Sequence, residues 1–345
     1  MSVNSSNCRN FAYDVVAIGN AIVDVLVQTN DSFLKESSLS KGNMLLLNKL
    51  EAEKLYASIK PDFESSGGSA ANTLVGLSQL GSNAGFIGRV RNDKLGEIFT
   101  KDIRSAGAQF ETKKAITGPP TARCLIFITP DAQRTMCTYL GASVLLEPED
   151  LDLSMVENTK VLYLEGYLWD HPSAKRAFLA AAETCKRSGG KIALSLSDAF
   201  CVDRHRESFL ELIETHIDIL FSNESEIKSL YQVSNIKDAF TKAKGHCEII
   251  AVTLGVKGSL ILSKDNLFEI SSYNLGSLLD TTGAGDLYAG GFLHGYTSGQ
   301  DLIKCGQIGS ICAGQIVTQL GSRSNVPLKG LVKEFLNLDI GKTSK

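Results

Sequence analysis

Short apolar runs alternate with helical patterns along most of this 345-residue chain. The runs have the length of single buried strands, and the segments between them carry apolar residues at the spacing of an amphipathic helix. Strands that alternate with helices in this way form βαβ units. We therefore predict an α/β fold with a mainly parallel sheet covered by helices on both faces. The predicted strands are residues 15–18, 86–87, 161–164, 192–196, 217–221 and 249–253, and the predicted helices are residues 70–80, 94–106, 174–187, 207–215, 224–231 and 236–244.

Two segments, at about residues 24–47 and 118–142, interrupt this alternation. Both have mixed or alternating strand character without a helix of their own, and a polar turn at residues 130–133 divides the second. A small separate β-sheet explains both segments. We predict one domain over residues 1–345, with this small sheet attached to it.

Composition narrows the functional classes. Lys and Arg number 35 against 38 Asp and Glu, and no long block of one sign occurs, so a nucleic-acid surface is not expected. The polar N-terminus and the lack of a long apolar stretch predict neither export nor a membrane span. Eight cysteines without CxxC spacing predict reduced thiols in a cytoplasm rather than disulfides or zinc ligands.

The run DTTGAGD at residues 280–286 is the most informative motif, because a small and apolar pattern that predicts a helix follows it. Gly283 and Gly285 allow a tight turn with uncovered N–H groups, and the positive end of the helix dipole favours an anion there. Asp286 could accept a proton from a substrate hydroxyl. The motif therefore indicates a general base beside an anion hole, although the same residues alone could simply cap a helix.

Two other groupings suggest a binding site for hydroxyl groups. Gly67 and Gly68 precede a predicted helix and permit close approach of a ligand, while Asn72 offers a donor and an acceptor to a diol. Asp24, with Asn20 beside it, follows the first strand, where a carboxylate can accept hydrogen bonds from two adjacent sugar hydroxyls. The alternatives are an ordinary helix start and a turn aspartate.

A fourth grouping, NESE at residues 223–226, follows the predicted strand at 217–221. Its hard oxygen ligands suit Mg²⁺ that keeps several waters while bridging phosphates, which points to Asn223 and Glu226. In isolation, the same string would be an acidic helix cap.

Together these motifs resemble the PfkB, or ribokinase, family of sugar and nucleoside kinases, from Asp14 to about Pro327 and in the expected order. The resemblance implies a ribokinase-like three-layer sandwich whose small β-sheet is a lid that excludes water during transfer. It implies ATP and Mg²⁺ as cofactors, and a monovalent cation such as K⁺ near Asp280. It also implies Asp286 as the base, an anion hole of Gly283, Ala284 and Gly285, Arg134 near the phosphoryl group, Ser69 in the substrate motif, magnesium at Asn223 and Glu226 through water, and ATP at Asn223, Thr253, Gly255 and Gly258.

Within the family, the chain looks most like the adenosine-kinase branch, which sandwiches a purine between apolar groups. The matching positions are Ile22, Met44, Leu46, Met136, Tyr167 and Phe200, each of which could instead be plain core. Asp198 and Met44 depart from the branch and leave the base preference open. The expected activity is therefore phosphorylation of a nucleoside, most of all the 5′-OH of adenosine, by a monomer or homodimer. The alternatives are a sugar kinase for ribose or fructose and a catalytically silent ligand-binding homologue.

Overall fold

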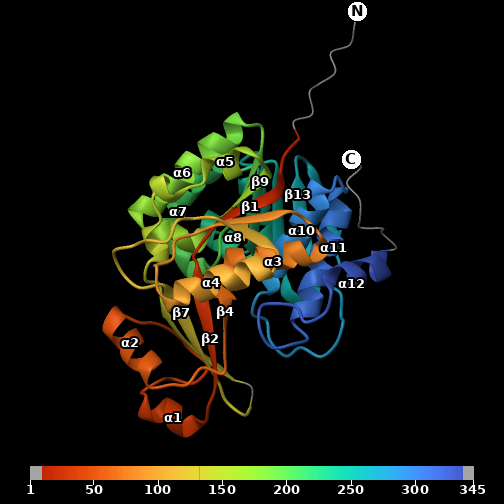
Figure 1. Ribbon diagram of the computed structural model, residues 1–345. Helices are drawn as coiled ribbons and strands as arrows, with labels where there is room; N and C mark the ends of the chain where they lie inside the picture. The colour runs from red at the N-terminus through yellow and green to blue at the C-terminus, as the bar shows by residue number, and fades with distance from the viewer. Residues whose placement is uncertain (1–9, 132, 337–345) are drawn as a thin grey trace, which may run out of the picture.

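A sheet of nine strands forms the centre of the molecule (Figure 1). The computed structural model describes residues 10–131 and 133–336. In sheet order the strands are β14 (Asn266–Ile270), β13 (Ser259–Ser263), β12 (Ile249–Thr253), β11 (Ile219–Asn223), β10 (Lys191–Ser195), β9 (Thr159–Glu165), β1 (Tyr13–Ile18), β5 (Ala84–Ile87) and β6 (Ala108–Phe110). All pairs from β12 to β6 are parallel, whereas β13 and β14 pair antiparallel at one edge.

Helices cover both faces of this sheet, because its central strands are apolar on both sides. In β1, Val15 and Ala17 face one helix layer while Val16 and Ile18 face the other, and all four are fully buried. The first layer holds α3 (Ser69–Leu80), α4 (Lys94–Ser105), α10 (Ala284–Thr297), α11 (Leu302–Ile316) and α12 (Leu328–Leu336). The second holds α5 (Leu153–Glu157), α6 (Pro172–Arg187), α7 (Ala199–His216), α8 (Glu224–Tyr231) and α9 (Ile236–Ala243). The predicted α/β fold class is confirmed.

A second sheet of five strands projects from the main body, at the lower left of Figure 1. Its order is β3 (Met44–Leu46), β8 (Arg134–Tyr139), β7 (Ala122–Ile128), β2 (Ile22–Gln28) and β4 (Phe63–Gly67). Strand β4 lies outside the two segments from which this sheet was predicted. Helices α1 (Asp31–Glu36) and α2 (Lys49–Ala57) cover one of its faces.

The expectation that residues 24–47 hold no helix is wrong, because α1 lies within them. Its six residues are too few to show helical periodicity, and the helix depends on Asn30, whose side chain accepts the Phe33 N–H at 3.0 Å. Helix α7 also begins earlier than predicted, with a kink at His205 (φ −125°, ψ 19°) that divides its two halves. The hairpin β13–β14 and the helices α11 and α12 were not predicted.

Two sequence-based exclusions can be compared with the described residues. None of the helices in residues 10–131 and 133–336 combines the length and the apolarity that crossing a membrane requires. The seven cysteines within the same ranges are free thiols, while Cys8 lies outside them.

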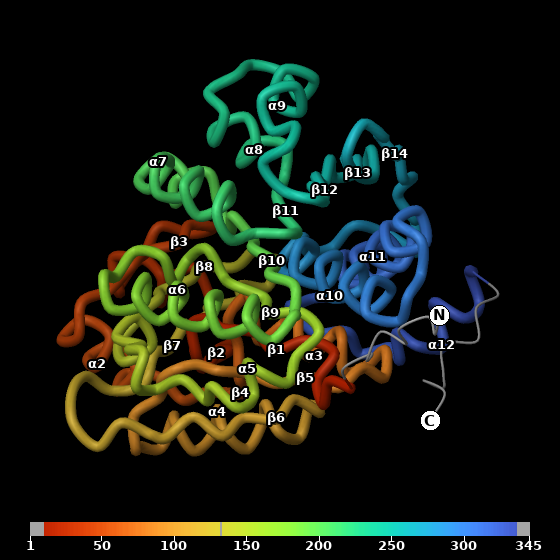
Figure 2. Tube along the Cα trace, turned by 90° about the horizontal axis from the view of Figure 1, so that it is seen from above, coloured from red at the N-terminus to blue at the C-terminus, as the bar shows by residue number. Residues whose placement is uncertain are grey.

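Helix α10, the element that carries the DTTGAGD motif into the core, packs closely against both α3 and α11. A Cβ atom at Gly290 would lie 2.7 Å from the carbonyl oxygen of Thr73 in α3, and one at Gly291 would lie 2.9 Å from the Cα of Gly309 in α11. Figure 2 shows α10 and α11 side by side. The small residues thus bring the start of α10 next to the start of α3.

We expect Gly290→Ala to lower the free energy of unfolding by about 1–3 kcal/mol, because the new methyl group would meet backbone that cannot move aside. Gly330→Ala in α12 is the matched control, since a Cβ there meets no atom within 4 Å, and it should stabilise by about 0.5–1 kcal/mol. Urea denaturation of both variants tests the difference. Equal stabilisation by the two substitutions would contradict the close approach of α10 and α3.

Candidate active site

The carboxyl ends of β10, β11 and β12 meet the first turn of α10 around a cavity of about 350 Å³. Parallel α/β sheets place ligands at this edge, where strand ends and helix N-termini converge. The cavity is lined by Ser69, Tyr167, Ser195, Ser197, Phe221, Ser222, Asn223, Glu226, Thr253, Thr281, Thr282, Gly283, Ala284, Gly285, Asp286 and Tyr288. The structure therefore brings together motifs that lie far apart in the sequence.

Asp286 is held from both sides by the first turn of α3. Ser69 Oγ donates to Asp286 Oδ1 at 2.6 Å, and Asn72 Nδ2 donates to Asp286 Oδ2 at 3.1 Å. Burial raises the pKa of Asp286, and these two hydrogen bonds oppose the rise. The Oδ1 atom of Asn72 is buried without a hydrogen-bond partner among the described residues, so it is free to accept a bond from a ligand. A fixed carboxylate with a spare acceptor beside it suits the removal of a proton from a bound hydroxyl.

The turn before α10 leaves room for an anion. Gly283 has φ +78° and provides no side-chain cap to the helix, and its backbone lies against Ser322. A Cβ at Gly285 would meet nothing within 4 Å, so the space in front of the helix is open. Of the three N–H groups expected in the anion hole, that of Ala284 donates to the Thr281 carbonyl oxygen at 3.1 Å. The helix start is otherwise ready for an oxyanion.

Arg134 reaches from the second sheet to this turn. Its Nη1 lies 3.0 Å from Asp280 Oδ2, both side chains are nine-tenths buried, and its Nε and Nη2 have no partner within the described ranges. Burial would raise the pKa of Asp280, but hydrogen bonds from Thr282 and Gly321 and the charge of Arg134 outweigh it and lower the pKa. The two spare donors of a buried arginine suit a phosphoryl group. A monovalent cation at Asp280, which stays a prediction, would have to share this carboxylate with Arg134.

Asp24 lies in β2 on the same side of the second sheet as Arg134. The approach of its carboxylate to Gly67 requires a glycine there, because a Cβ would stand 2.3 Å from Asp24 Oδ2. Burial raises the pKa of Asp24 to about 6, against the positive charges of Arg323 and Arg134. Arg323 is itself fixed, with Nη1 2.6 Å from Asp102 Oδ2 and Nη2 donating to Ser66 Oγ at 2.6 Å. This acid therefore sits between two arginines.

Asn20, predicted beside Asp24, turns away from it. It is 1% exposed, its Nδ2 donates to Glu165 Oε1 at 2.7 Å, and its Oδ1 accepts from Ser143 Oγ at 2.8 Å. The side chain of Asn20 is thus engaged inside the protein. Glu165, which sequence reasoning missed, is the residue that holds it.

A larger cavity of about 570 Å³ adjoins the first. It shares Thr253, Gly285 and Tyr288 with the smaller one, and Gly255 and Gly258 also line it, while their contact with a nucleotide stays a prediction. Its other wall comes from the segment 272–278 and from α11, which the sequence did not identify. The two cavities therefore adjoin at the start of α10, where they share lining residues.

Asn223 and Glu226 form a capping box at the start of α8. Glu226 N donates to Asn223 Oδ1 at 2.9 Å, and Asn223 N donates to Glu226 Oε2 at 2.9 Å. Burial raises the pKa of Glu226 to about 7. No group of three or more His, Cys, Asp or Glu in the described part of the chain is arranged to hold a metal on its own. A single buried acid at the cavity instead fits a cation that ligand phosphates and water would also hold.

Several of the apolar side chains that were predicted to contact the nucleoside base are exposed to solvent. Phe200 is 76% exposed at the start of α7, Met44 and Leu46 are 57% and 59% exposed in β3, and Tyr167 is 38% exposed. Met136 pairs with Met44 across β8 and β3, and Ile22 lies in β2, so three of the predicted residues share the second sheet with Leu46. Tyr167 lines the smaller cavity, whereas Phe200, Met44 and Leu46 line neither of the two cavities, and the base pocket stays a prediction.

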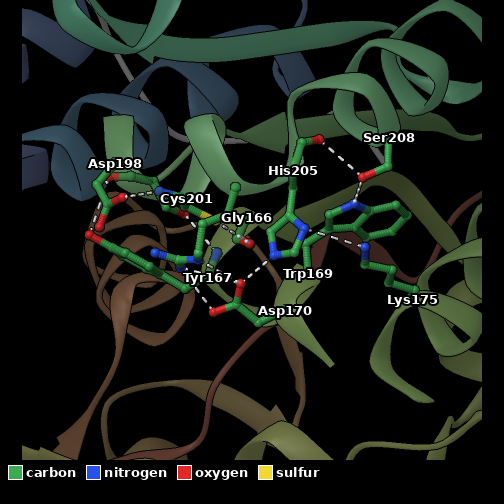
Figure 3. A network of polar contacts seen from close by, with 11 residues as sticks. Gly166, Tyr167, Trp169, Asp170, Lys175, Asp198, Cys201, His205 and Ser208 are labelled. Atoms are coloured by element: carbon green, nitrogen blue, oxygen red, sulfur yellow. Dashed lines mark hydrogen bonds and ion pairs between the residues drawn. The ribbon is translucent and has the colours of Figure 1, made fainter. Parts of the chain in front are cut away.

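A polar network joins the segment after β9, which carries Tyr167, to helix α7 (Figure 3). Asp170 contacts His205 at the kink of α7 and binds Arg204 Nη2 at 3.0 Å. Trp169 Nε1 donates to Ser208 Oγ at 2.9 Å, and Lys175 Nζ lies 5.3 Å from the centre of the Trp169 ring. The first half of α7, with Phe200, is thereby attached to the segment that carries Tyr167.

Several residues near the site were not predicted from the sequence. Glu165 ends a buried apolar strand, a pattern that could have identified it, whereas Arg323 stands in an ordinary polar loop. Ser197 has φ +72°, an unusual conformation for a residue other than glycine, and its Oγ accepts the Tyr167 N–H at 3.1 Å. Such strain is typical of functional sites.

Comparison with known proteins shows which family the chain resembles. A model of the pfkB family of carbohydrate kinases matches residues 61–329. The adenosine kinase from Sinorhizobium meliloti is 46% identical, with a TM-score of 0.85 over 93% of this chain and 99% of its own. A probable sugar kinase from Rhizobium etli CFN 42 is 43% identical, with a TM-score of 0.86 over 94% and 98%.

Curated relatives divide between nucleoside and sugar substrates. A nucleoside kinase from Methanocaldococcus jannaschii is 28% identical over 78% of this chain and 85% of its own length. A 5-dehydro-2-deoxygluconokinase from Bacillus subtilis is 25% identical over 94% and 96%. The family predicted from the sequence is confirmed, and both substrate classes occur among its relatives.

The buried acids predict a pH-dependent stability. Burial raises the pKa values of Glu165 and Glu226 to about 7, so the folded protein binds these protons more tightly than the unfolded chain does. Stability is therefore lost as pH rises through about 7, by about 1.5 kcal/mol for the two together between pH 6.5 and 8. His294, with its pKa lowered to about 4 by burial, acts in the opposite sense around pH 6.5, because its unfolded form is still half protonated there, and it offsets about 0.4 kcal/mol of this loss.

Thermal unfolding of the ligand-free protein across this interval measures the loss. Glu226→Gln should retain only about half of the pH dependence, because one of the two titrating groups is gone. A wild-type midpoint that is constant from pH 6.5 to 8 would contradict the raised pKa values.

Proposed function

This chain belongs to the pfkB family of carbohydrate kinases, and we propose that it transfers the γ-phosphoryl group of ATP to the 5′-OH of a nucleoside, with adenosine as the acceptor. One observation carries the proposal. Asp286, fixed by Ser69 and Asn72, lies at the helix start where the two cavities meet, with Asp24 on the acceptor side. Phosphoryl transfer needs a general base placed between the bound nucleotide and the acceptor hydroxyl.

Transfer begins when the acceptor hydroxyl lies against Asp286. The carboxylate accepts the hydroxyl proton as the acceptor oxygen forms its bond to the γ-phosphorus, and the bond from that phosphorus to the β–γ bridging oxygen breaks. ADP leaves with the electron pair of the broken bond. The raised pKa of Asp286 makes it a stronger base than an exposed aspartate would be.

Positive groups are placed to contact the phosphoryl group during its transfer. The start of α10 offers backbone N–H groups and the positive end of its dipole, and Arg134 offers two donors that have no partner among the described residues. Because Arg134 belongs to the second sheet, we propose that this sheet is a lid, formed in large part by residues 24–47 and 118–142. Closing the lid would exclude water that could otherwise hydrolyse ATP.

Glu226 and Asn223 are the residues of this chain that would hold magnesium near the phosphates, through water. Glu226 is 5% exposed and has no cationic partner among the described residues, so its charge calls for a counter-ion. Mg²⁺ supplies charge neutralisation for the phosphate oxygens when it is bound. Thr253, Gly255 and Gly258 line the larger cavity and are assigned to ATP.

The acceptor site combines polar anchors for a sugar with an apolar wall for a base. Asp24 and the unpartnered Asn72 Oδ1 both accept hydrogen bonds, as two sugar hydroxyls would require. Phe200, Met44 and Leu46 expose apolar surface that a purine would cover and a free sugar would leave in water. This wall favours a nucleoside over the sugar substrates of other relatives.

Asp286→Asn should lower kcat by roughly a hundredfold or more with little change in KM for either substrate, because the amide cannot accept the proton. The amide oxygen can still accept one of the bonds from Ser69 and Asn72, so the fold should persist. A coupled assay of ADP release measures both constants. Retention of most of the turnover would leave Asp286 as a helix-capping residue only.

Adenosine should be phosphorylated with a higher kcat/KM than inosine, guanosine, ribose or fructose, and Phe200→Ala should reduce that value for adenosine by about tenfold or more. The reason is the loss of about 1.5–3 kcal/mol of apolar contact with the base, which a free sugar never makes. Ile116→Ala is the control, because Ile116 is a similarly exposed apolar residue, at 79%, that does not belong to the proposed base pocket. A preference for a free sugar, unaffected by Phe200→Ala, would establish a sugar kinase instead.

A further inference from the structure

Glu165, at the end of β9, is a buried carboxylate that the mechanism above does not use. It is 1% exposed. Its Oε1 accepts the Asn20 N–H at 3.2 Å and the Asn20 Nδ2–H at 2.7 Å, and its Oε2 accepts the Ala70 N–H at 2.9 Å. Three donors thus converge on one acid that has no cationic partner among the described residues.

The bond to Ala70 supplies what the start of α3 lacks. The N-cap of α3 is Gly68, which makes no side-chain hydrogen bond to the helix. A helix start normally receives such a bond from its own capping residue. Here a carboxylate from another strand accepts a first-turn N–H group and also joins it to the loop after β1 through Asn20.

The same first turn of α3 holds Asp286. Ser69 precedes Ala70 and donates to Asp286 Oδ1, while Asn72 follows it and donates to Asp286 Oδ2. Each step in this series is a direct hydrogen bond or a separation of at most two residues within the same helical turn. A shift of the turn would therefore move both donors that fix the carboxylate of Asp286.

We propose that Glu165 is a positioning residue for phosphoryl transfer, which holds the first turn of α3 so that Ser69 and Asn72 keep Asp286 directed at the acceptor hydroxyl. This role rests on the proposed kinase function. Glu165 does not line either cavity described above, so it acts through α3 and not through contact with substrate.

Glu165 also acts on Asp286 through charge. The pKa of Glu165 is raised to about 7, mainly by burial. The negative charge of Asp286 raises it further. The other titratable groups that sense Glu165 are Tyr163, Tyr167 and Cys201, whose pKa values burial raises far enough to keep them neutral at pH 8. Ionisation of Glu165 near pH 7 therefore adds a negative charge that makes Asp286 more basic.

Glu165→Gln tests the proposal with minimal change in shape. The amide oxygen can accept from Asn20 or from Ala70, but the amide nitrogen must then face the other donor. We expect kcat to fall roughly 10- to 100-fold, as for a small misplacement of a reacting group, with KM for ATP and adenosine within about twofold of wild type. In the wild-type enzyme, we expect ionisation of Glu165 to produce an inflection in the pH profile of kcat near pH 7. In Glu165→Gln this inflection should be absent. A rise in the KM of the acceptor with unchanged kcat would overturn the proposal in favour of direct substrate contact.

Two further variants separate positioning from general stability. Asp218→Asn is the matched control, because Asp218 Oδ2 accepts the Ile192 N–H at 2.8 Å at the opposite end of the sheet, and this variant should leave kcat and its pH profile unchanged. In an Asp286→Asn background, Glu165→Gln should change kcat less than about twofold, since there is no base left to position. Independent, multiplicative losses would refute the role. If Glu165→Gln fails to fold, Glu165→Asp, which keeps the charge and withdraws it from Ala70, takes its place with the same expected fall in kcat.

A crystal structure of Glu165→Gln keeps this inference separate from the proposed function. If the wild-type protein phosphorylates none of the tested acceptors, the proposed function fails. The contacts of Asp286 in the variant still show whether Glu165 positions the first turn of α3. Loss of the hydrogen bonds from Ser69 and Asn72 to Asp286 would support positioning by Glu165. Unchanged bonds would overturn it.

Discussion

Two hydrogen bonds to the carboxylate of Asp286 join the two helices on which the site is built. Helices α3 and α10 begin side by side because Gly290 lets α10 approach the backbone of α3 within a distance that no side chain would allow. Each helix brings one part of the proposed chemistry: α10 brings Asp286 as the base and the anion site, and α3 brings the groups that orient Asp286. The close packing in the core thus fixes the geometry at the surface, and a looser contact would separate the donors from the acid they hold.

Unbalanced negative charge is the cost of this arrangement. Asp24, Glu165, Glu226 and Asp286 all have raised pKa values, chiefly through burial. Arg134 and Arg323 offset part of the charge around Asp24, but each is already bound to another acid. A site with surplus negative charge and unpartnered arginine donors is best completed by a ligand that brings its own cation, as a nucleotide with magnesium does. Binding of such a ligand would therefore raise the free energy of unfolding of the protein, because it offsets the cost of burying these acids.

The sequence predicted what depends on local pattern. The parallel core followed from apolar runs of strand length, and the motif residues around Asp286, Asn223 and Thr253 do line a common site. Long-range contacts could not be predicted in this way. Arg323 contacts Ser66 across 257 residues, and the wall formed by α11 depends on packing rather than on a motif. Asn20 shows the limit of motif reasoning, because its place beside the site was predicted while its side chain is engaged with Glu165.

In the proposed mechanism, one strand of the second sheet couples selection of the acceptor to transfer of the phosphoryl group. Arg134 and Met136 are two residues apart in β8, so their side chains point to the same face. Arg134 reaches the anion turn through Asp280, while Met136 extends, with Met44 of the neighbouring strand, the apolar surface expected to cover the base. A nucleobase that packs on this surface would hold β8 in the closed position and keep Arg134 in contact with the phosphoryl group. An acceptor without a nucleobase would leave the same strand without apolar support, so the proposed mechanism predicts a penalty in turnover as well as in binding.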